Sequence, residues 1–196
     1  MNATSKEAVG LAYSLEGMLH AKRMTWEAIG QIARQVKPGM QESAAREMGL
    51  QVLREMGMER IWHPLLIRFG ANTLKTFKQR SDGDPLLQEN DLFFIDLGVV
   101  WDRHEGDCGA TFVVGDDAEM HACAAAAKSL FDQVHDHWQS HLVAGPELYR
   151  YAQEQARAMG WALNLDIKGH RVSDFPHAIY RLSLIHISEP TRLLSI

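Results

Sequence analysis

The spacing of apolar residues in the first part of the chain predicts two helices. Between the capping-box pattern Thr4-x-x-Glu7 and Lys37-Pro38-Gly39, apolar side chains recur at every third or fourth position. This is the period of a helix with one buried face. A second helix is expected over about Glu42–Met56, and Gly57 is suited to end it.

The rest of the chain alternates between strand-like and helical patterns. Short apolar runs bounded by glycine, proline or aspartate are typical of strands, whereas the three-to-four-residue period predicts helices. The order is helix, helix, three strands, helix, helix, strand, so the second group begins to repeat the first, and the fold class is α+β. The expected elements are a strand over Trp62–Gly70, an exposed loop over Lys75–Glu89, a hairpin over Phe93–Gly115, helices over Ala118–His141 and Gly145–Gly160, and a strand over Trp161–Ile167.

The hairpin carries one carboxylate in each apolar strand, Asp96 and Asp107. Burying an unpaired carboxylate is costly, so such a group is normally paired, protonated or bound to a metal. If the turn is centred between Trp101 and Asp102, the two aspartates lie directly opposite each other, where like charges repel. A divalent cation held between them removes the repulsion, and we favour this interpretation. The alternative is one buried aspartate that accepts a backbone N–H and one exposed aspartate.

Composition narrows the class of protein. The chain has 196 residues, 46% hydrophobic and 23% charged, which is typical of a globular domain with a substantial core. A formal net charge of -5 argues against non-specific nucleic-acid binding. No apolar run approaches the roughly 20 residues of a membrane span, and the N-terminus lacks a secretory signal pattern. The two cysteines, Cys108 and Cys123, give no disulfide framework, so a cytoplasmic location is expected.

Three sets of segments in the chain combine polar residues with chemically useful spacing. In chain order, they are Trp62-His63-Pro64 with Asn72, Asp96-Leu97-Gly98 with Asp107-x-x-x-Thr111-Phe112, and Gly169-His170 with His177. Together they resemble the M24 metallopeptidases, the family of methionine aminopeptidase, Xaa-Pro aminopeptidase and creatinase. They are similar to the family's upstream substrate-binding histidine region, its paired-aspartate hairpin, and its metal-ligand histidine with a second histidine that faces the substrate. The resemblance covers about Ala21 to Tyr180.

This resemblance implies a pita-bread fold, in which two αβ halves enclose a dinuclear metal site, with the second half incomplete in this chain. The family holds two divalent ions with two aspartates, one histidine and two glutamates, and Asp96, Asp107 and His170 match the first three. Carboxylate and imidazole ligands suit Mn, Co, Fe or Zn. The implied reaction is hydrolysis of the N-terminal peptide bond of a peptide substrate by a hydroxide held between the metals.

The resemblance also assigns roles around the metal. His63 and His177 are the expected catalytic residues, because they match the histidines that contact the substrate backbone and its carbonyl. Thr111 is expected to support the ligands, and Asp174 could orient His170 or His177, although a loop cap explains Asp174 equally well. A homodimer is expected from the resemblance alone.

The chain departs from the family pattern at its end. The two glutamate ligands lie downstream of the histidine in the family, but the only acidic residue after His177 is Glu189. Leu182–Arg192 reads LSLIHISEPTR, which looks like a translated sequencing-library adapter. We therefore expect residues 1–181 to be a partial catalytic domain and 182–196 a non-native tail. Such a chain is expected to be inactive and poorly soluble.

Within the family, a Xaa-Pro aminopeptidase or a dipeptidase specificity fits better than methionine removal. His170 is followed by Arg171-Val172 and Pro176-His177, and not by the Gly-Ile-Gly run associated with the methionine enzymes. Two alternatives stay open: a non-catalytic binding domain of the same fold, and a creatinase-type or lyase-type enzyme.

Other titratable groups have simpler interpretations. His137 and His141 are spaced one helical turn apart, but a solvated helix face is expected more than a metal site. His104 and Glu105 fall in the hairpin turn and are expected to be exposed. Cys108 alternates to the opposite strand face from Asp107, so we expect it to pack in the core.

Overall fold

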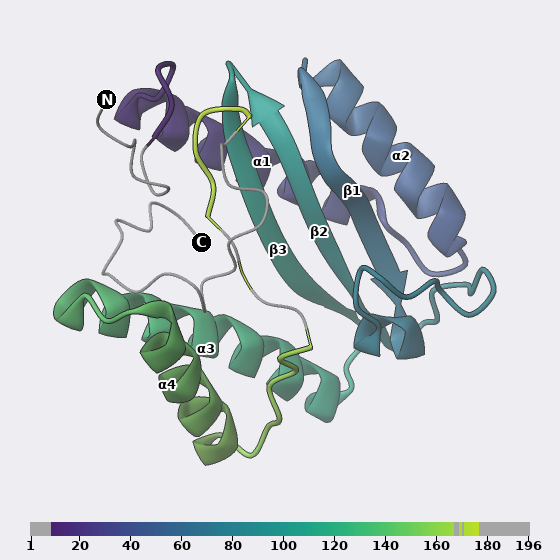
Figure 1. Cartoon of the computed structure of the whole chain (residues 1–196). Coiled ribbons are helices and arrows are strands. Elements are labelled where there is room, and N and C mark those ends of the chain that lie inside the picture. Colours follow the sequence, from purple (N-terminus) through teal and green to yellow (C-terminus); the bar gives the residue numbers. More distant parts are fainter. Residues whose placement is uncertain (1–8, 167–168, 170, 177–196) are drawn as a thin grey trace.

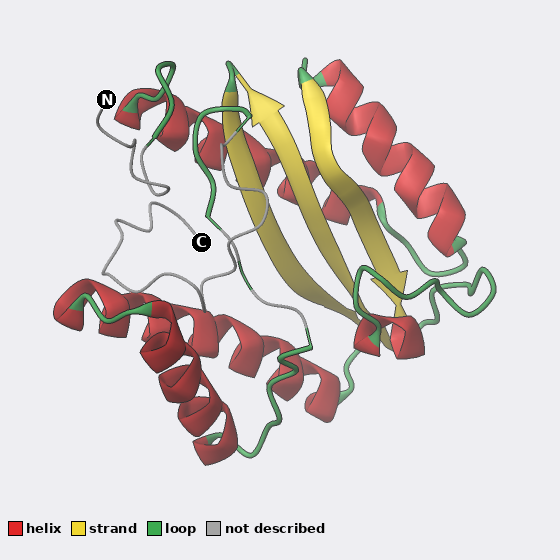
Figure 2. Ribbon diagram, in the orientation of Figure 1, coloured by secondary structure: helices red, strands yellow, loops and turns green. Residues whose placement is uncertain are grey.

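The computed structural model shows a three-stranded antiparallel sheet with helices on both sides (Figures 1 and 2). It describes residues 9–166, 169 and 171–176. Within these residues no helix is long and apolar enough to cross a membrane. The elements are α1 (Leu15–Gln35), α2 (Glu42–Glu55), β1 (Arg60–Phe69), the 3-10 helix η1 (Gly70–Leu74), β2 (Asp91–Trp101), β3 (His104–Val114), α3 (Ala118–His141) and α4 (Gly145–Ala158).

The core lies between the sheet and helices α1 and α2, which cover one of its faces (Figure 1). The sheet order is β1-β2-β3. Because side chains alternate along a strand, every second residue of β2 points into this core and the residues between them point to the other face. The residues of β2 that are buried in the core are Phe93, Ile95, Leu97, Val99 and Trp101.

The first helix starts later than the sequence pattern suggests. It begins at Leu15, and the Ser14 side chain caps it by accepting a hydrogen bond from the N–H of Gly17 at 3.0 Å. The expected capping box, Thr4 with Glu7, lies outside the described residues. Residues 10–14 precede the helix as a separate segment, so the apolar residues before Leu15 do not extend the helical face.

The hairpin turn is tighter than expected, which corrects the predicted pairing of the aspartates. Asp102 and Arg103 have φ angles of 45° and 59°, as in a two-residue type I′ turn. Trp101 consequently pairs with His104, Asp96 faces Gly109, and Asp107 faces Gly98. The two aspartates are diagonal neighbours, not direct partners.

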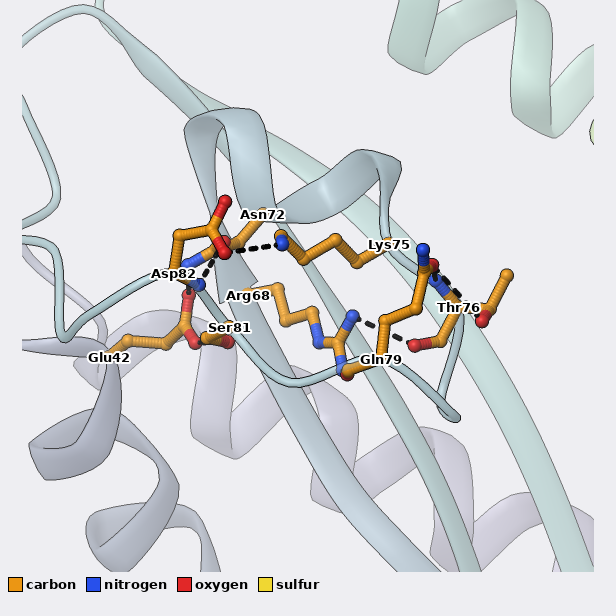
Figure 3. Close-up of polar contacts among 8 residues, drawn as sticks. All are labelled: Glu42, Arg68, Asn72, Lys75, Thr76, Gln79, Ser81 and Asp82. Carbon is orange, nitrogen blue, oxygen red and sulfur yellow. Dashed lines mark hydrogen bonds and ion pairs between the residues drawn. The ribbon is translucent and has the colours of Figure 1, made fainter.

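The polar loop after η1 was expected to be simply exposed, but its base is tied to the fold by buried charged groups (Figure 3). The buried Glu42 carboxylate accepts hydrogen bonds from the N–H of Phe69 at 3.0 Å and from the Asn72 amide at 3.1 Å, and it also bonds the Ser81 hydroxyl. The Arg68 guanidinium, also buried, donates to two loop carbonyls, those of Thr76 at 3.0 Å and Gln79 at 2.6 Å.

Replacing Glu42 with alanine is expected to lower the free energy of unfolding by about 2 to 3 kcal/mol, because buried donors lose their acceptor. Urea denaturation followed by circular dichroism measures this change. Glu47→Ala is the matched control on the same helix. The Glu47 side chain is exposed and forms a surface ion pair with Arg54, so its loss should change stability by less than about 1 kcal/mol. Equal effects of the two substitutions would contradict this account of the loop.

The second pair of helices is as predicted, but the described part of the strand expected after it, residues 161–166, forms no strand. Helix α3 spans Ala118–His141 and α4 begins at Gly145 with Pro146 in its first turn. Residues 161–166, the described part of the predicted strand, have no strand partner. The chain instead returns to the tip of the β2–β3 hairpin, where Asp174 forms an isolated bridge with His104 (Figure 1). We call Val172–Phe175 the returning segment.

Candidate metal centre

Asp96 and Asp107 lie on the sheet face opposite α1 and α2. Asp96 pairs with Gly109, and Asp107 pairs with Gly98. Because glycine has no side chain, nothing at these paired positions lies between the two carboxylates. Their side chains are 39% and 25% exposed. With Thr111, which lies on the same face and pairs with Phe94, they line a cavity of about 850 Å³ between the sheet, α3 and α4. A ligand could therefore reach both carboxylates.

A bulge in β1 brings His63 to the same face. His63 pairs with Gly98, whereas Leu66 pairs with Asp96, so three steps along β1 match two along β2. Without this extra residue, His63 would point into the core together with Leu65. Bulges redirect side chains in this way, and a proline such as Pro64 is tolerated there because one backbone donor is already unpaired.

The three side chains meet closely enough to bind one cation. The Nε2 atom of His63 lies 3.1 Å from Oδ1 of Asp107 and 3.8 Å from Oδ1 of Asp96. One ligand atom from each residue lies within 4.8 Å of the other two, and this is the only such three-residue cluster among the described residues. Gly98 makes the approach possible, because a Cβ atom there would lie 2.1 Å from the His63 ring.

The charges of this cluster favour a cation. Burial lowers the pKa of His63, but the hydrogen bond to Asp107 and the charges of Asp107 and Asp96 outweigh it, so the pKa is raised overall. Both ring nitrogens lie against acceptors, Nε2 against Asp107 and Nδ1 against the Pro64 carbonyl oxygen at 3.1 Å. The imidazolium form satisfies both contacts. A positive charge is thus stabilised where the two carboxylates approach each other.

The donor set suits a divalent transition metal. Asp96 and Asp107 supply carboxylates, which together with an imidazole suit Mn, Co, Fe or Zn, and both are part-exposed, so binding requires only partial dehydration. His63 in its imidazolium form has no lone pair for a metal and donates hydrogen bonds beside the carboxylates. The predicted ligand His170 and the predicted substrate-facing His177 lie outside the described residues. Their roles stay predictions, as does the supporting role of Thr111. The resemblance predicts His63 at this site as a substrate contact, but its close approach to both aspartates was not predicted, because the bulge that redirects it leaves no clear pattern in the sequence.

Cys108 and the histidines of α3 are separate from this centre. Cys108 packs in the core, where burial and the nearby Asp107 charge raise the pKa of its thiol to about 12, so it is not a thiolate ligand. The rings of His137 and His141 are stacked with centroids 4.4 Å apart, and His137 also stacks on Tyr151 at 3.8 Å. Neither histidine belongs to a three-ligand cluster among the described residues.

The hairpin tip contains buried polar groups where the sequence suggested exposed ones. His104 and Glu105 are only 4% and 1% exposed. His104 donates through Nδ1 to the Asp102 carbonyl oxygen and accepts the N–H of Ser14 at Nε2. Residues 10–14, which we call the N-terminal segment, and the returning segment together cover the tip. The hairpin sequence alone does not indicate that either segment contacts the tip.

Asp174 holds the N-terminal segment at this tip. Its carboxylate accepts the N–H groups of Gly10 at 2.8 Å and Ala12 at 3.1 Å, together with the hydroxyl of Ser173 at 2.9 Å. Burial raises the pKa of Asp174, but these hydrogen bonds outweigh burial and hold the pKa below its usual value. This is the loop-cap role. The prediction that Asp174 also orients His170 or His177 stays a prediction.

The contribution of Asp174 to stability should depend on pH. Because the folded pKa is below the unfolded value of about 3.9, the stabilisation is complete only above about pH 5 and is lost as the pH falls through the folded pKa. Asp174→Asn should destabilise the protein by about 2 kcal/mol at pH 7 and by much less near pH 2.5. Thermal melts of both proteins across this range test the expectation. A pH-independent difference in Tm would contradict it.

Comparison with known proteins identifies the family. The family model for metallopeptidase family M24 matches residues 16–186. Several solved structures are similar to the chain, each with less than 25% sequence identity. One is an X-Pro aminopeptidase from Thermotoga maritima, with 19% identity and a TM-score of 0.61. The match covers 79% of this chain and 43% of that chain. A prolidase from Pyrococcus furiosus has 17% identity, coverages of 95% and 50%, and a TM-score of 0.60.

A methionine aminopeptidase from Thermotoga maritima shares 13% identity, with coverages of 85% and 69% and a TM-score of 0.66. No curated protein matches the chain at the significance required. The mixed helix and sheet architecture is that of the pita-bread fold, and the chain spans less than half of the X-Pro aminopeptidase that it resembles. With a match over residues 16–186, this chain belongs to metallopeptidase family M24.

Proposed function

We propose that this chain carries the metal-binding part of a Xaa-Pro aminopeptidase-like enzyme, which hydrolyses the N-terminal peptide bond of its substrate. The observation that carries the proposal is the convergence of His63, Asp96 and Asp107 from three strands on one open sheet face. The resemblance to an X-Pro aminopeptidase and a prolidase favours substrates with proline in the second position.

The residues have distinct proposed roles. Asp96 and Asp107 would hold divalent metal ions, together with His170. Bound metal ions would supply the Lewis acid that activates water and polarises the peptide carbonyl. His63 would contact the substrate, because its Nε2–H lies beside the carboxylates and its ring is fixed by the adjacent Trp62, with ring centroids 4.7 Å apart. His177 would donate a hydrogen bond to the substrate carbonyl.

Five ligands are expected for the pair of metal ions, and this chain offers three of them, so we further propose that the two glutamates lie outside this chain. The 196-residue protein, supplied with Mn²⁺ or Co²⁺, should then bind metal but release no N-terminal residue from a Xaa-Pro peptide. The protein read from the natural gene past codon 181 should release it, and Asp107→Asn should abolish the release.

The outcomes separate the parts of the proposal. Robust turnover by the 196-residue chain would refute the claim that ligands are missing. A longer natural protein that binds metal but cleaves no peptide would refute the aminopeptidase assignment and favour a binding domain. Faster release of methionine from a Met-Ala peptide than of the first residue from a Xaa-Pro peptide would refute the proposed specificity.

A further inference from the structure

Glu105 is a buried carboxylate that the proposed chemistry does not use. It lies two residues before Asp107 on β3, so both side chains leave the strand on the same face. Only 1% of Glu105 is exposed, although it is next to a hairpin turn. A carboxylate is costly to bury, so its position requires hydrogen bonds that offset the loss of water.

The returning segment supplies one such bond to the carboxylate and adds backbone bonds beside it. The N–H of Ser173 donates to Oε2 of Glu105 at 3.2 Å, and the N–H of Glu105 donates to the Ser173 carbonyl oxygen at 2.9 Å. One further backbone bond follows, from the N–H of Phe175 to the Arg103 carbonyl oxygen at 2.6 Å. The side chain of Arg60 lies over the Phe175 ring, 4.9 Å from its centre. The returning segment is therefore docked against the strand that carries Asp107.

We propose that Glu105 is a positioning residue for the metal centre: it fixes the returning segment beside Asp107. His170 and His177, the two histidines of the proposed reaction, flank this segment in the sequence, so a docked segment would limit how far the chain on either side of it can move from Asp107. The inference rests on the proposed function, because positioning matters only if the aspartates hold a metal. Glu105 itself touches neither substrate nor metal in this account.

The test compares Glu105→Ala and Glu105→Gln with Glu59→Ala in the full 196-residue chain. Glu59 is the matched control, because its carboxylate also accepts a hydrogen bond at the hairpin tip, from the N–H of Arg103 at 3.0 Å, but it is exposed and bonds no atom of the returning segment. Two readouts are needed. The rate of trypsin cleavage after Arg171 reports whether the segment is docked, and visible absorption during a Co²⁺ titration reports metal affinity and coordination.

Glu105→Ala should accelerate cleavage after Arg171 and weaken Co²⁺ binding about tenfold, with an altered absorption band, as is typical when a group that orients ligands is lost. Glu105→Gln keeps an oxygen acceptor for Ser173 and should restore both readouts toward those of the parent chain. Glu59→Ala should leave both unchanged. If Glu105→Ala fails to fold, the same comparison is made between Glu105→Gln and Glu105→Met.

Three results would overturn the inference in different ways. Faster cleavage with unchanged Co²⁺ affinity and spectrum would show that Glu105 anchors the segment without positioning the metal centre. Unchanged cleavage would show that Glu105 does not anchor it. If the parent chain binds no Co²⁺, the proposed function fails, and the inference fails with it, even where the cleavage result confirms the anchor.

Discussion

Replacing Asp107 with asparagine is expected to weaken Mn²⁺ binding by at least about 100-fold. This loss of affinity is larger than the loss usually seen when a group that only orients a metal ligand is removed. Asp107 is the aspartate that lies closest to His63, and its carboxylate is the negative partner of that side chain at 3.1 Å. An asparagine keeps the shape but loses the charge that a hard divalent cation requires. Loss of the free-Mn²⁺ signal in electron paramagnetic resonance titrations measures the affinity.

The same titration needs a matched control, for which Asp116→Asn is suitable. Asp116 is exposed between β3 and α3, and its substitution removes the same charge from the chain without touching the cluster. It should bind Mn²⁺ like the parent protein. Because Asp107 is part-exposed, the Asp107→Asn protein should remain folded, with a circular dichroism spectrum like that of the parent. Equal Mn²⁺ affinities of the two variants would place the metal elsewhere.

Gly106→Ala is expected to reduce the free energy of unfolding by about 3 kcal/mol, the upper end for overpacking in a core. A Cβ atom at Gly106 would lie 1.9 Å from the Thr25 hydroxyl oxygen and 3.0 Å from the Ala21 carbonyl oxygen. That hydroxyl is itself fully buried, donating to Ala21 at 2.7 Å and accepting the Trp101 indole N–H at 3.0 Å. Helix α1 would have to move away from the sheet to make room.

Gly109→Ala tests whether this effect is specific to the contact with α1. Gly109 lies on the same strand, but a Cβ atom there would have its nearest neighbour at an ordinary distance of 3.6 Å, the Ile95 carbonyl oxygen. We expect its substitution to change stability by less than about 1 kcal/mol. Denaturant midpoints of both variants provide the comparison. A larger loss for Gly109→Ala than for Gly106→Ala would contradict the packing described here.

The helices and the approximate strands could be predicted from the sequence, because apolar periodicity determines which face is buried. The hairpin register could not. Type I′ turns usually contain glycine, and Asp102-Arg103 has none, so the sequence gives no sign of a two-residue turn at this position. Gly106 is needed for the close approach of α1. The strand predicted over Trp161–Ile167 alternates correctly, but its described part, residues 161–166, has no strand beside it to pair with.

The candidate site was predictable in part for a similar reason. Two acids in apolar strands, Asp96 and Asp107, are visible in one sequence as an electrostatic problem that a metal can solve. His63 joins them only because of the bulge in β1, which depends on the pairing between strands. Glu105 is buried by the returning segment, about 70 residues later in the chain, and contacts at that separation leave no local pattern.

Asp96 and Asp107 should together hold a divalent metal ion, and an anomalous diffraction experiment tests this most directly. Crystals grown with Mn²⁺ and measured near the manganese absorption edge should show an anomalous peak about 2.2 Å from carboxylate oxygens of both Asp96 and Asp107. Crystals of Asp107→Asn grown in the same way should lack the peak. A strong peak at another site, such as His137 with His141, and none between the two aspartates would contradict the account.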